Sequence, residues 1–308
     1  MSQRFSILSI VVLALGLPFA AWGKEETSSK EGRGEEKTTT TTTASDASGD
    51  VLLDSAIAAF GNYETIRAAT RLQVHLRGHH LFGPGTYLQK GPSHGRRVRS
   101  EMVLRGRAGK FTFTQVNDGN RLWLLEVSPG TSRLRLIDLQ RLRDSGILSE
   151  AARGTPANFD ALQISGLAGL MKSIQESFRF GRAVRIEWNE KSVWAMRGVW
   201  RPSMLQQLVG ISGDELDPAE WRQQLPEWAP TEIGILLDAK TLFPYRFEFL
   251  THIGDNPQGQ SQLEPIAILE LLEIRFDTDI DEAQFDRPSD IRPTDITKEY
   301  LRKASKID

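Results

Sequence analysis

Three histidines in the segment HLRGHH have the spacing in this chain that comes nearest to a metal site. In an extended strand His75 and His79 would share one face, with His80 beside them, and imidazole nitrogen is a ligand for Zn²⁺ or Cu²⁺. No carboxylate with matching spacing accompanies them, and Gly78 indicates that the strand ends there. Because the ligand set is incomplete, we expect exposed edge histidines and no bound metal.

The segment DTDIDEAQFDRP places carboxylates at alternate positions, as a calcium loop does. Asp277, Asp279 and Asp281 would be the first, third and fifth ligands of such a loop. Its sixth position is Glu282 instead of Gly, and its twelfth is Pro288 instead of Glu. These departures exclude an EF-hand and favour a solvated loop after the last strand.

The enzyme signatures of the sequence are weak. The string G-x-S-x-G occurs at 91–95 but joins two predicted strands, so it is not the strand-to-helix elbow of a hydrolase, and the chain has no H-E-x-x-H helix and no glycine-rich phosphate loop. It also has no cysteine, which excludes disulfides, thiol nucleophiles and thiolate metal sites. We therefore expect a protein without catalytic activity or cofactor. A hydrolase whose carboxylates come together only in the fold stays open as an alternative.

Arginine is dense between residues 96 and 143, and most of these arginines alternate with apolar residues. Alternation is typical of the wet face of a half-buried sheet. The alternative is a basic rim that binds the phosphate or carboxylate of a head group. The net charge of −2 gives no electrostatic reason to expect nucleic acid or an acidic lipid surface as a partner.

The first residues of the chain read as a secretory signal. An apolar run extends from Phe5 to Phe19, and Ala21 and Gly23 occupy the −3 and −1 positions of a plausible cleavage site before Lys24. The alternative is an uncleaved anchor, but the run is shorter than the ~20 apolar residues that a spanning helix needs. The signal is therefore the favoured interpretation.

Composition divides the chain into three parts. Residues 1–23 are the signal peptide, and residues 24–50 form a charged linker rich in Thr, Ser and Glu, without large apolar side chains. Such a segment buries too little apolar surface to offset its ordering entropy, so we expect it to be disordered. Residues 51–308 contain the apolar periodicities of a folded domain.

The folded part begins with a helical pattern and then changes to a period of two. The segment VLLDSAIAAFGNYETI predicts a helix, and segments such as KFTFTQV, RLWLLEV and SRLRLIDL predict strands joined by short turns. About ten such strands indicate an antiparallel meander in which each strand pairs with its predecessor. A second apolar stripe predicts a helix over 165–178. The predicted class is α+β, mainly β, with a curved antiparallel sheet whose concave side holds the helices.

The strand RLWLLEV is apolar on both faces. Trp123 and Leu125 point one way, whereas Leu122 and Leu124 point the other way. A sheet with one wet face should alternate apolar and polar residues, so both faces of this strand need a cover. We expect Trp123 and Leu125 to face the helix over 165–178, and the Pro-rich loop 214–230 to cover the other pair.

The chain resembles the outer-membrane lipoprotein carrier family, LolA and its relatives, which include LppX/LprG-type lipid carriers and the sensor RseB. The resemblance extends over about 51–290. It is carried by the segments NYETI and LQVHLRG, GTYLQKGPSHGRRVRSE, VNDGNRLWLLEVSPGTSRLRLIDL, EIGILLDAKTLFPYRFEFL and LLEIRFDTDIDEAQFDRPSD. It implies an unclosed half-barrel with a helical lid, and a cavity between them that binds acyl chains.

The resemblance also implies a set of site residues. Arg99 matches the strand arginine of the family and would contact a head group. Side chains facing the cavity would be Met102, Leu104, Phe111, Phe113, Trp123, Leu125, Leu134, Leu136, Leu167, Leu170, Met171, Ile174, Trp188 and Phe247. In most proteins such apolar stripes are ordinary core, and only the resemblance favours a cavity.

These observations predict an exported carrier or binding protein that holds an acyl chain, a lipid or a lipoprotein. We expect a monomer in the periplasm, with secretion as the alternative, and with membrane-associated donor and acceptor proteins as partners. A second interpretation is an envelope sensor or scaffold of the same fold that binds a protein partner. A carrier should copurify with lipid, whereas a sensor should retain a protein.

If residues 1–23 are a cleaved signal, the exported protein begins near Lys24. N-terminal sequencing of the exported form should find this start. Recovery of Met1 in a membrane fraction would contradict it.

Overall fold

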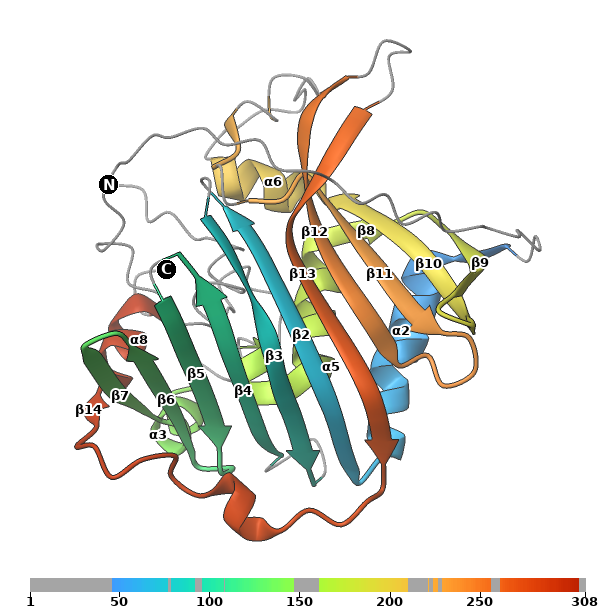
Figure 1. Cartoon of the computed structure of the whole chain (residues 1–308). Coiled ribbons are helices and arrows are strands. Elements are labelled where there is room, and N and C mark those ends of the chain that lie inside the picture. Colours follow the sequence, from blue (N-terminus) through green and yellow to red (C-terminus); the bar gives the residue numbers. More distant parts are fainter. Residues whose placement is uncertain are drawn as a thin grey trace.

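The framework of the protein is one sheet of 14 strands, seen from its outer side in Figure 1. The structure is a computed structural model that describes residues 46–76, 79–91, 96–107, 109–146, 161–209, 221, 224–226, 229–255 and 261–304. The first strands are β1 (Asp46–Ser48), β2 (Thr65–Leu76), β3 (His79–Lys90), β4 (Arg97–Gly106), β5 (Gly109–Asn117), β6 (Arg121–Ser128) and β7 (Thr131–Asp138). The later strands are β8 (Phe178–Phe180), β9 (Arg182–Trp188), β10 (Lys191–Trp200), β11 (Glu232–Asp238), β12 (Pro244–Asp255), β13 (Ser261–Phe276) and β14 (Thr294–Asp295).

The helices in the described residues are fewer than the strands. They are α2 (Gly49–Ala59), α3 (Leu139–Asp144), α5 (Ala161–Ser177), α6 (Pro202–Val209) and α8 (Thr297–Ala304), with the 3-10 turns η2 (Phe60–Asn62) and η3 (Glu282–Phe285). Helix α6 begins at Pro202, whose fixed φ suits the first helical position and whose missing N–H has no intrahelical partner to lose.

The sheet consists of two meanders joined in its middle. Strands β2 to β7 pair in sequence, and so do β9 to β13, with antiparallel neighbours throughout both series. The series meet where β13 pairs with β2, from Ala267 opposite Val74 to Phe276 opposite Ile66. The prediction that each strand pairs with its predecessor is wrong between the two series, because β9 lies beside β1 and β10 and not beside β7, and the last long strand returns to the first.

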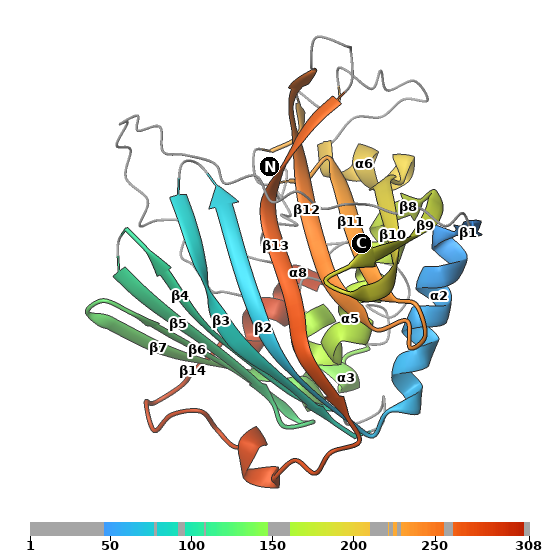
Figure 2. The same ribbon diagram turned by 45° about the vertical axis from the view of Figure 1, so that its right-hand side comes forward.

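The sheet is open and curved, with β1 and β14 at its two edges. Figure 2 shows it bending around α5, with α2 beside it. A twisted antiparallel sheet of this width curls because the rotation between neighbouring strands accumulates. The predicted class, a mainly β half-barrel with helices in its concave side, is confirmed.

Helices α2 and α5 cover the inner face, as the sequence predicted. Leu53 and Phe60 from the first helical segment, and Leu170 and Met171 from α5, belong to one buried cluster with inner side chains of the strands. Because no second sheet closes the molecule on this side within the described residues, these helices remove the inner apolar face from water.

The inner face has a second cover near its far edge. Leu122 and Leu124 are buried against α3 and the C-terminal segment, where Leu142 and Ile296 meet them and Tyr300 packs at the side. The predicted cover, loop 214–230, is therefore wrong for these two leucines; most of that loop lies outside the described residues. Helix α8 supplies the contact that the sequence analysis missed.

The folded domain begins a few residues earlier than composition predicted. Asp46–Ser48 forms β1, which pairs with β9, and the main-chain N–H of Gly49 donates to the carbonyl of Gly181 at 2.7 Å. The end of the predicted linker is thus part of the sheet, because backbone pairing requires no large side chain. The predicted signal peptide and the rest of the linker lie outside the described residues. Among the described helices, none has the length and apolarity that crossing a membrane requires.

Gly85 in β3 marks a close approach of two strands and provides a test of the fold. A Cβ there would overlap the carbonyl oxygen of Glu101 and lie 2.5 Å from Sδ of Met102. We expect Gly85→Ala to lower the free energy of unfolding by about 1–3 kcal/mol through overpacking. Gly61→Ala is the matched control, since its Cβ would meet nothing within 4 Å. Urea denaturation of both variants tests this, and equal midpoints would contradict it.

Candidate functional site

The inner face under α5 gathers most of the predicted cavity residues. The strands contribute Met102, Leu104, Phe113 and Phe247, with Phe111 partly buried at the side, and α5 contributes Leu167, Leu170, Met171 and Ile174. Their exposed fractions are 8% or less, apart from that of Phe111. The helix and the sheet therefore share one continuous apolar contact surface.

Methionine is concentrated in this contact surface. The chain has five methionines, and all four that follow Met1 lie in the inner cluster: Met102, Met171 and Met196 are buried, and Met204 packs at its side. Methionine is unbranched and polarizable, so it fills irregular spaces and repacks around different neighbours. A core built in this way tolerates rearrangement between helix and sheet better than one of β-branched residues.

A polar contact fastens the beginning of α5 to the sheet. The main-chain N–H of Leu167 donates to the hydroxyl oxygen of Tyr87 at 3.0 Å, and that hydroxyl donates to Oε1 of Gln89 at 2.7 Å. Tyr87 and Gln89 lie on the inner face of β3 and are almost completely buried. Burial raises the pKa of Tyr87 above its ordinary value, so the hydroxyl stays neutral at physiological pH.

Gly166 allows this close approach. It interrupts α5 with φ 68° and ψ −156°, a conformation that favours glycine. A Cβ at this position would lie 2.5 Å from the Tyr87 hydroxyl and 2.7 Å from Oε1 of Gln89. The helix can therefore meet the buried polar pair only because a glycine precedes Leu167.

The same polar pair is incompletely satisfied. The amide Nε2 of Gln89 is buried and has no hydrogen-bond partner within the described residues. Arg96 is also buried nearby; desolvation lowers its pKa, whereas the charge interaction with Tyr87 acts in the opposite direction. An unsatisfied buried amide costs stability in the closed arrangement, and its N–H is available to a polar group that enters here.

The other end of α5 is held by exposed and half-exposed polar contacts. The guanidinium of Arg201 donates to the carbonyl of Gln175 at 2.9 Å, and Nε2 of Gln175 donates to Oδ1 of Asp54 in α2 at 2.5 Å. The two inner helices are thus linked to each other as well as to the sheet. Together α2 and α5 form a lid with a large apolar underside, and its polar attachments lie at the helix ends and at Tyr87.

Four predicted cavity residues lie on the opposite face. Trp123 and Leu134 are buried with Ile280 and Phe285 of the C-terminal segment, and Leu125 and Leu136 pack against that cluster. Val116 is the strand partner of Trp123, whereas Phe113 on the other face of β5 belongs to the inner cluster. The prediction that Trp123 and Leu125 lie under the helix over 165–178 is therefore wrong. Both faces of β6 are covered, so apolarity alone did not identify the inner one.

Trp188 and Arg99 also lie away from the predicted space. Trp188 in β9 faces the side opposite Trp194 of the inner cluster, and its ring packs 6.1 Å from that of Tyr245. Arg99 lies on the outer face of β4, where it donates to the carbonyl of Gln284 at 3.1 Å. The expected contact of Arg99 with a head group inside the half-barrel is therefore wrong.

The dense arginines occupy both faces of the sheet. Arg97 and Arg99 lie on the outer face, where they contact the C-terminal segment. Arg135 lies on the inner face beyond Phe113, where its guanidinium pairs with Glu126 and burial lowers its pKa. The outer residues agree with the wet-face interpretation only in part, because a segment of the chain covers them.

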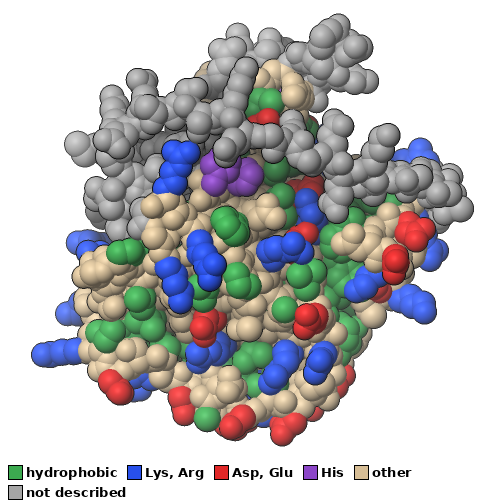
Figure 3. Space-filling model, viewed as in Figure 1, with side chains coloured by type: hydrophobic (Ala, Val, Ile, Leu, Met, Phe, Trp, Pro, Cys, Tyr) green, Lys and Arg blue, Asp and Glu red, His purple; other side chains and the backbone are tan. Residues whose placement is uncertain are grey.

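The histidines and the aspartates do not form metal sites in the described residues. His75 and His80 face each other across the β2–β3 hairpin with ring centroids 4.5 Å apart, and both are exposed, as predicted. Their strands are central in the sheet, so they are not edge histidines; Figure 3 shows histidine side chains, in purple, on the outer surface. Desolvation, followed by the repulsion of His80, lowers the pKa of His75. Among the described residues, no group of three or more His, Asp and Glu side chains has a ligand geometry.

The aspartates of the predicted solvated loop have structural partners instead. Oδ1 of Asp277 accepts from the N–H of Glu64 at 2.8 Å, and Oδ1 of Asp281 accepts from the N–H of Ala283 at 3.1 Å. Asp281 therefore caps η3 in place of binding a cation. The loop is ordered against the sheet, which the sequence analysis did not predict.

Comparisons with known proteins find similarity only among solved structures, at low sequence identity. No family model and no curated protein matches the chain. MucB shares 11% identity with a TM-score of 0.37, over 78% of this chain and 64% of MucB. LprF from Mycobacterium bovis shares 10% identity (TM-score 0.34, 78% and 96% covered), and a LolA superfamily protein from Nitrosomonas europaea shares 11% (TM-score 0.29, 78% and 98% covered). The open sheet with a helical cover that the sequence analysis predicted is present, and similarity this low says nothing of a ligand.

The contact between Tyr87 and α5 predicts how removal of the Tyr87 hydroxyl changes stability and hydrogen exchange. Tyr87→Phe removes one hydroxyl and leaves the N–H of Leu167 and the amide of Gln89 without a buried partner. We expect a loss of about 1–3 kcal/mol in the free energy of unfolding and faster hydrogen exchange at Leu167. The control is Tyr63→Phe, whose ring stacks on Phe276 at 4.0 Å. Unchanged exchange at Leu167 would contradict the contact.

Proposed function

We propose that the protein is an exported binding protein or carrier that holds the acyl chain of a lipid or lipoprotein between the sheet and the lid of α2 and α5. The observation that supports this most is the character of the lid contact. A large apolar surface rich in methionine, leucine and phenylalanine is covered by helices whose polar attachments lie at their ends and at Tyr87. Contacts of methionine repack around different neighbours more readily than contacts of β-branched residues.

Ligand entry in this proposal requires the lid to move. The inner side chains pack against each other when the helices are closed, so an acyl chain must replace contacts between α5 and the strands. Each methylene that enters recovers about 0.8 kcal/mol of apolar transfer free energy. A dozen methylenes therefore recover an apolar free energy comparable with that of the α5 side chains that they displace, and they offset the hydrogen bond to Tyr87.

The buried polar pair favours a ligand with a polar group at one end. When α5 moves, the hydroxyl of Tyr87 and the free amide of Gln89 lose their cover and face the same space. Both are neutral hydrogen-bonding groups, and they suit an ester or amide carbonyl. The ends of acylated glycerol and acylated protein N-termini carry such carbonyls.

The cellular location of the protein is proposed from the sequence alone. The apolar run from Phe5 to Phe19 and the residues before Lys24 support export, with the periplasm as the destination and secretion as the alternative. A carrier in that compartment requires a donor and an acceptor at membranes. No catalytic step is part of the proposal.

Weakening the lid should strengthen ligand binding. If the closed lid competes with the ligand, Tyr87→Phe lowers the free energy needed to open it. We expect the delipidated variant to bind an apolar fluorescent probe without a polar head, which cannot use the Tyr87 hydroxyl, up to about tenfold more tightly than the wild type, since about 1.4 kcal/mol of closing energy is removed. Fluorescence titration measures both affinities.

The matched control is Leu125→Trp, which adds bulk on the outer face. It should leave probe affinity unchanged, whereas bulk at Met171 under the lid should weaken it. Wild-type protein without saturable probe binding would contradict the proposal. So would a Leu125→Trp variant that loses binding while its unfolding midpoint is retained.

A further inference from the structure

The outer face of the sheet carries an apolar cluster that a wet face would not have. Leu88, Val116, Trp123 and Leu134, from β3, β5, β6 and β7, are each 7% exposed or less. A half-solvated sheet should present polar residues at these positions. Only two buried side chains outside the strands complete the cluster, Ile280 and Phe285.

These two side chains belong to a segment that we call the strap, residues 277–287. It follows β13 and crosses the outer face of the sheet toward β14, as Figures 1 and 2 show. Its regular structure is limited to the four residues of η3. The strap returns to the sheet at Thr294 and Asp295, whose partners are Arg135 and Leu136 of β7, so it is anchored at both ends.

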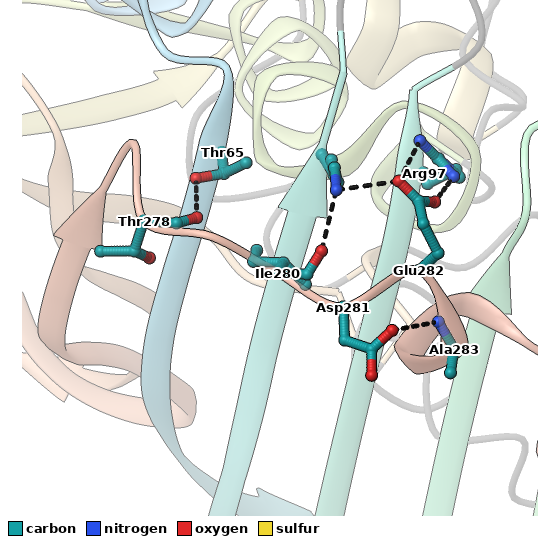
Figure 4. Close-up of polar contacts among 8 residues, drawn as sticks. Thr65, Arg97, Thr278, Ile280, Asp281, Glu282 and Ala283 are labelled. Carbon is teal, nitrogen blue, oxygen red and sulfur yellow. Dashed lines mark hydrogen bonds and ion pairs between the residues drawn. The ribbon is translucent and has the colours of Figure 1, made fainter.

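Cations of the strands hold the strap in its middle. Nζ of Lys90 contacts the carbonyl of Ile280 and Oε1 of Glu282, both at 2.8 Å, and the guanidinium of Arg97 also pairs with Glu282, as Figure 4 shows. Arg99 donates to the carbonyl of Gln284 at 3.1 Å. The outer face therefore offers a row of three cations beside an apolar cluster.

The strap is acidic, and thus complements this row. Its middle carries Asp279, Asp281, Glu282 and Asp286 against the single cation Arg287, which lies over the ring of Trp123 at 5.6 Å. Segments of this kind bind by inserting apolar side chains at fixed spacing while charges set the orientation. In the strap, Ile280 and Phe285 insert into the outer apolar cluster, and Glu282 pairs with the cations beside it.

The polar contacts in the middle of the strap involve an exposed carboxylate, whereas Ile280 and Phe285 are buried. Glu282 is 57% exposed, and exposed ion pairs contribute little to stability. The hydroxyl of Thr278 is buried without a hydrogen-bond partner in the described residues, although its carbonyl accepts from Thr65 at 2.6 Å. The two sides of the strap have contacts of their own, between Asp277 and the N–H of Glu64 and between Thr294–Asp295 and β7.

We propose that the strap covers a docking surface for a partner protein, formed by the outer apolar cluster and the row of cations, and that the partner replaces the strap with an extended acidic segment of its own. The segment carries an aliphatic side chain, a carboxylate two residues later and an aromatic side chain three residues after that. It contacts the row of Lys90, Arg97 and Arg99 and the cluster residues that Ile280 and Phe285 now cover. This surface is on the face opposite the lid, so the inference is independent of ligand binding under α5.

A labelled peptide with the sequence of residues 278–287 tests whether this docking surface binds such a segment. The protein used is the full chain with Glu282→Lys and Phe285→Ala, which loosens the strap and leaves both anchors in place. We expect the labelled peptide to bind this variant saturably and at least tenfold more tightly than it binds the wild type. A control peptide with the same two substitutions should not bind, and raised salt should weaken binding of the wild-type peptide.

A second measurement keeps the proposal open to refutation if the double variant unfolds. Excess peptide added to the wild-type chain should increase hydrogen exchange in residues 280–285 and leave exchange in α5 unchanged. Equal binding of the two peptides, or no change in exchange of the strap, would show that the strap is a fixed part of the fold and overturn the proposal. Binding of the loosened chain to phosphatidylglycerol vesicles without peptide binding would overturn it in favour of a lipid surface.

Discussion

The pairing of β13 with β2 is the interaction on which the rest of the structure depends. It joins a meander from the first half of the chain to a meander from the second half, and so makes one sheet wide enough to curl. Ile66, Leu271 and Phe247 then lie in the same inner cluster although they come from distant parts of the sequence. A curved sheet of this width has two long faces, and each apolar part of either face needs a cover.

The covers differ in kind, and the difference indicates what each face is for. The inner face is covered by helices whose contacts are apolar and rich in methionine, with one buried polar contact at Tyr87. Near the far edge, α3 and α8 cover Leu122 and Leu124 as an ordinary core does. The outer face is covered by an acidic strap beside a row of cations. In the two roles that we propose, the cover of the inner face moves to admit a ligand, and the cover of the outer face moves to admit a partner.

Apolar periodicity in the sequence predicted individual strands and helices, but it did not predict which distant strands pair. Period-two alternation identified β4 to β7, and the apolar stripe of Leu167 and Met171 identified α5 as a cover. The pairing of β13 with β2 was missed, because a ladder between distant strands leaves no local signal. Trp123 was assigned to the wrong face, because both faces of its strand are buried. Alternation places Tyr87 and Gln89 on one face, but only the fold brings them beneath Leu167.

Photo-crosslinking with a diazirine-labelled fatty acid tests the central claim most directly, since it reports where an apolar ligand lies. The account predicts covalent label on the lid and the inner strands, at Met171, Met102 and their neighbours, and competition by unlabelled fatty acid. Label confined to the outer cluster around Trp123, or no label that unlabelled fatty acid displaces, would contradict it.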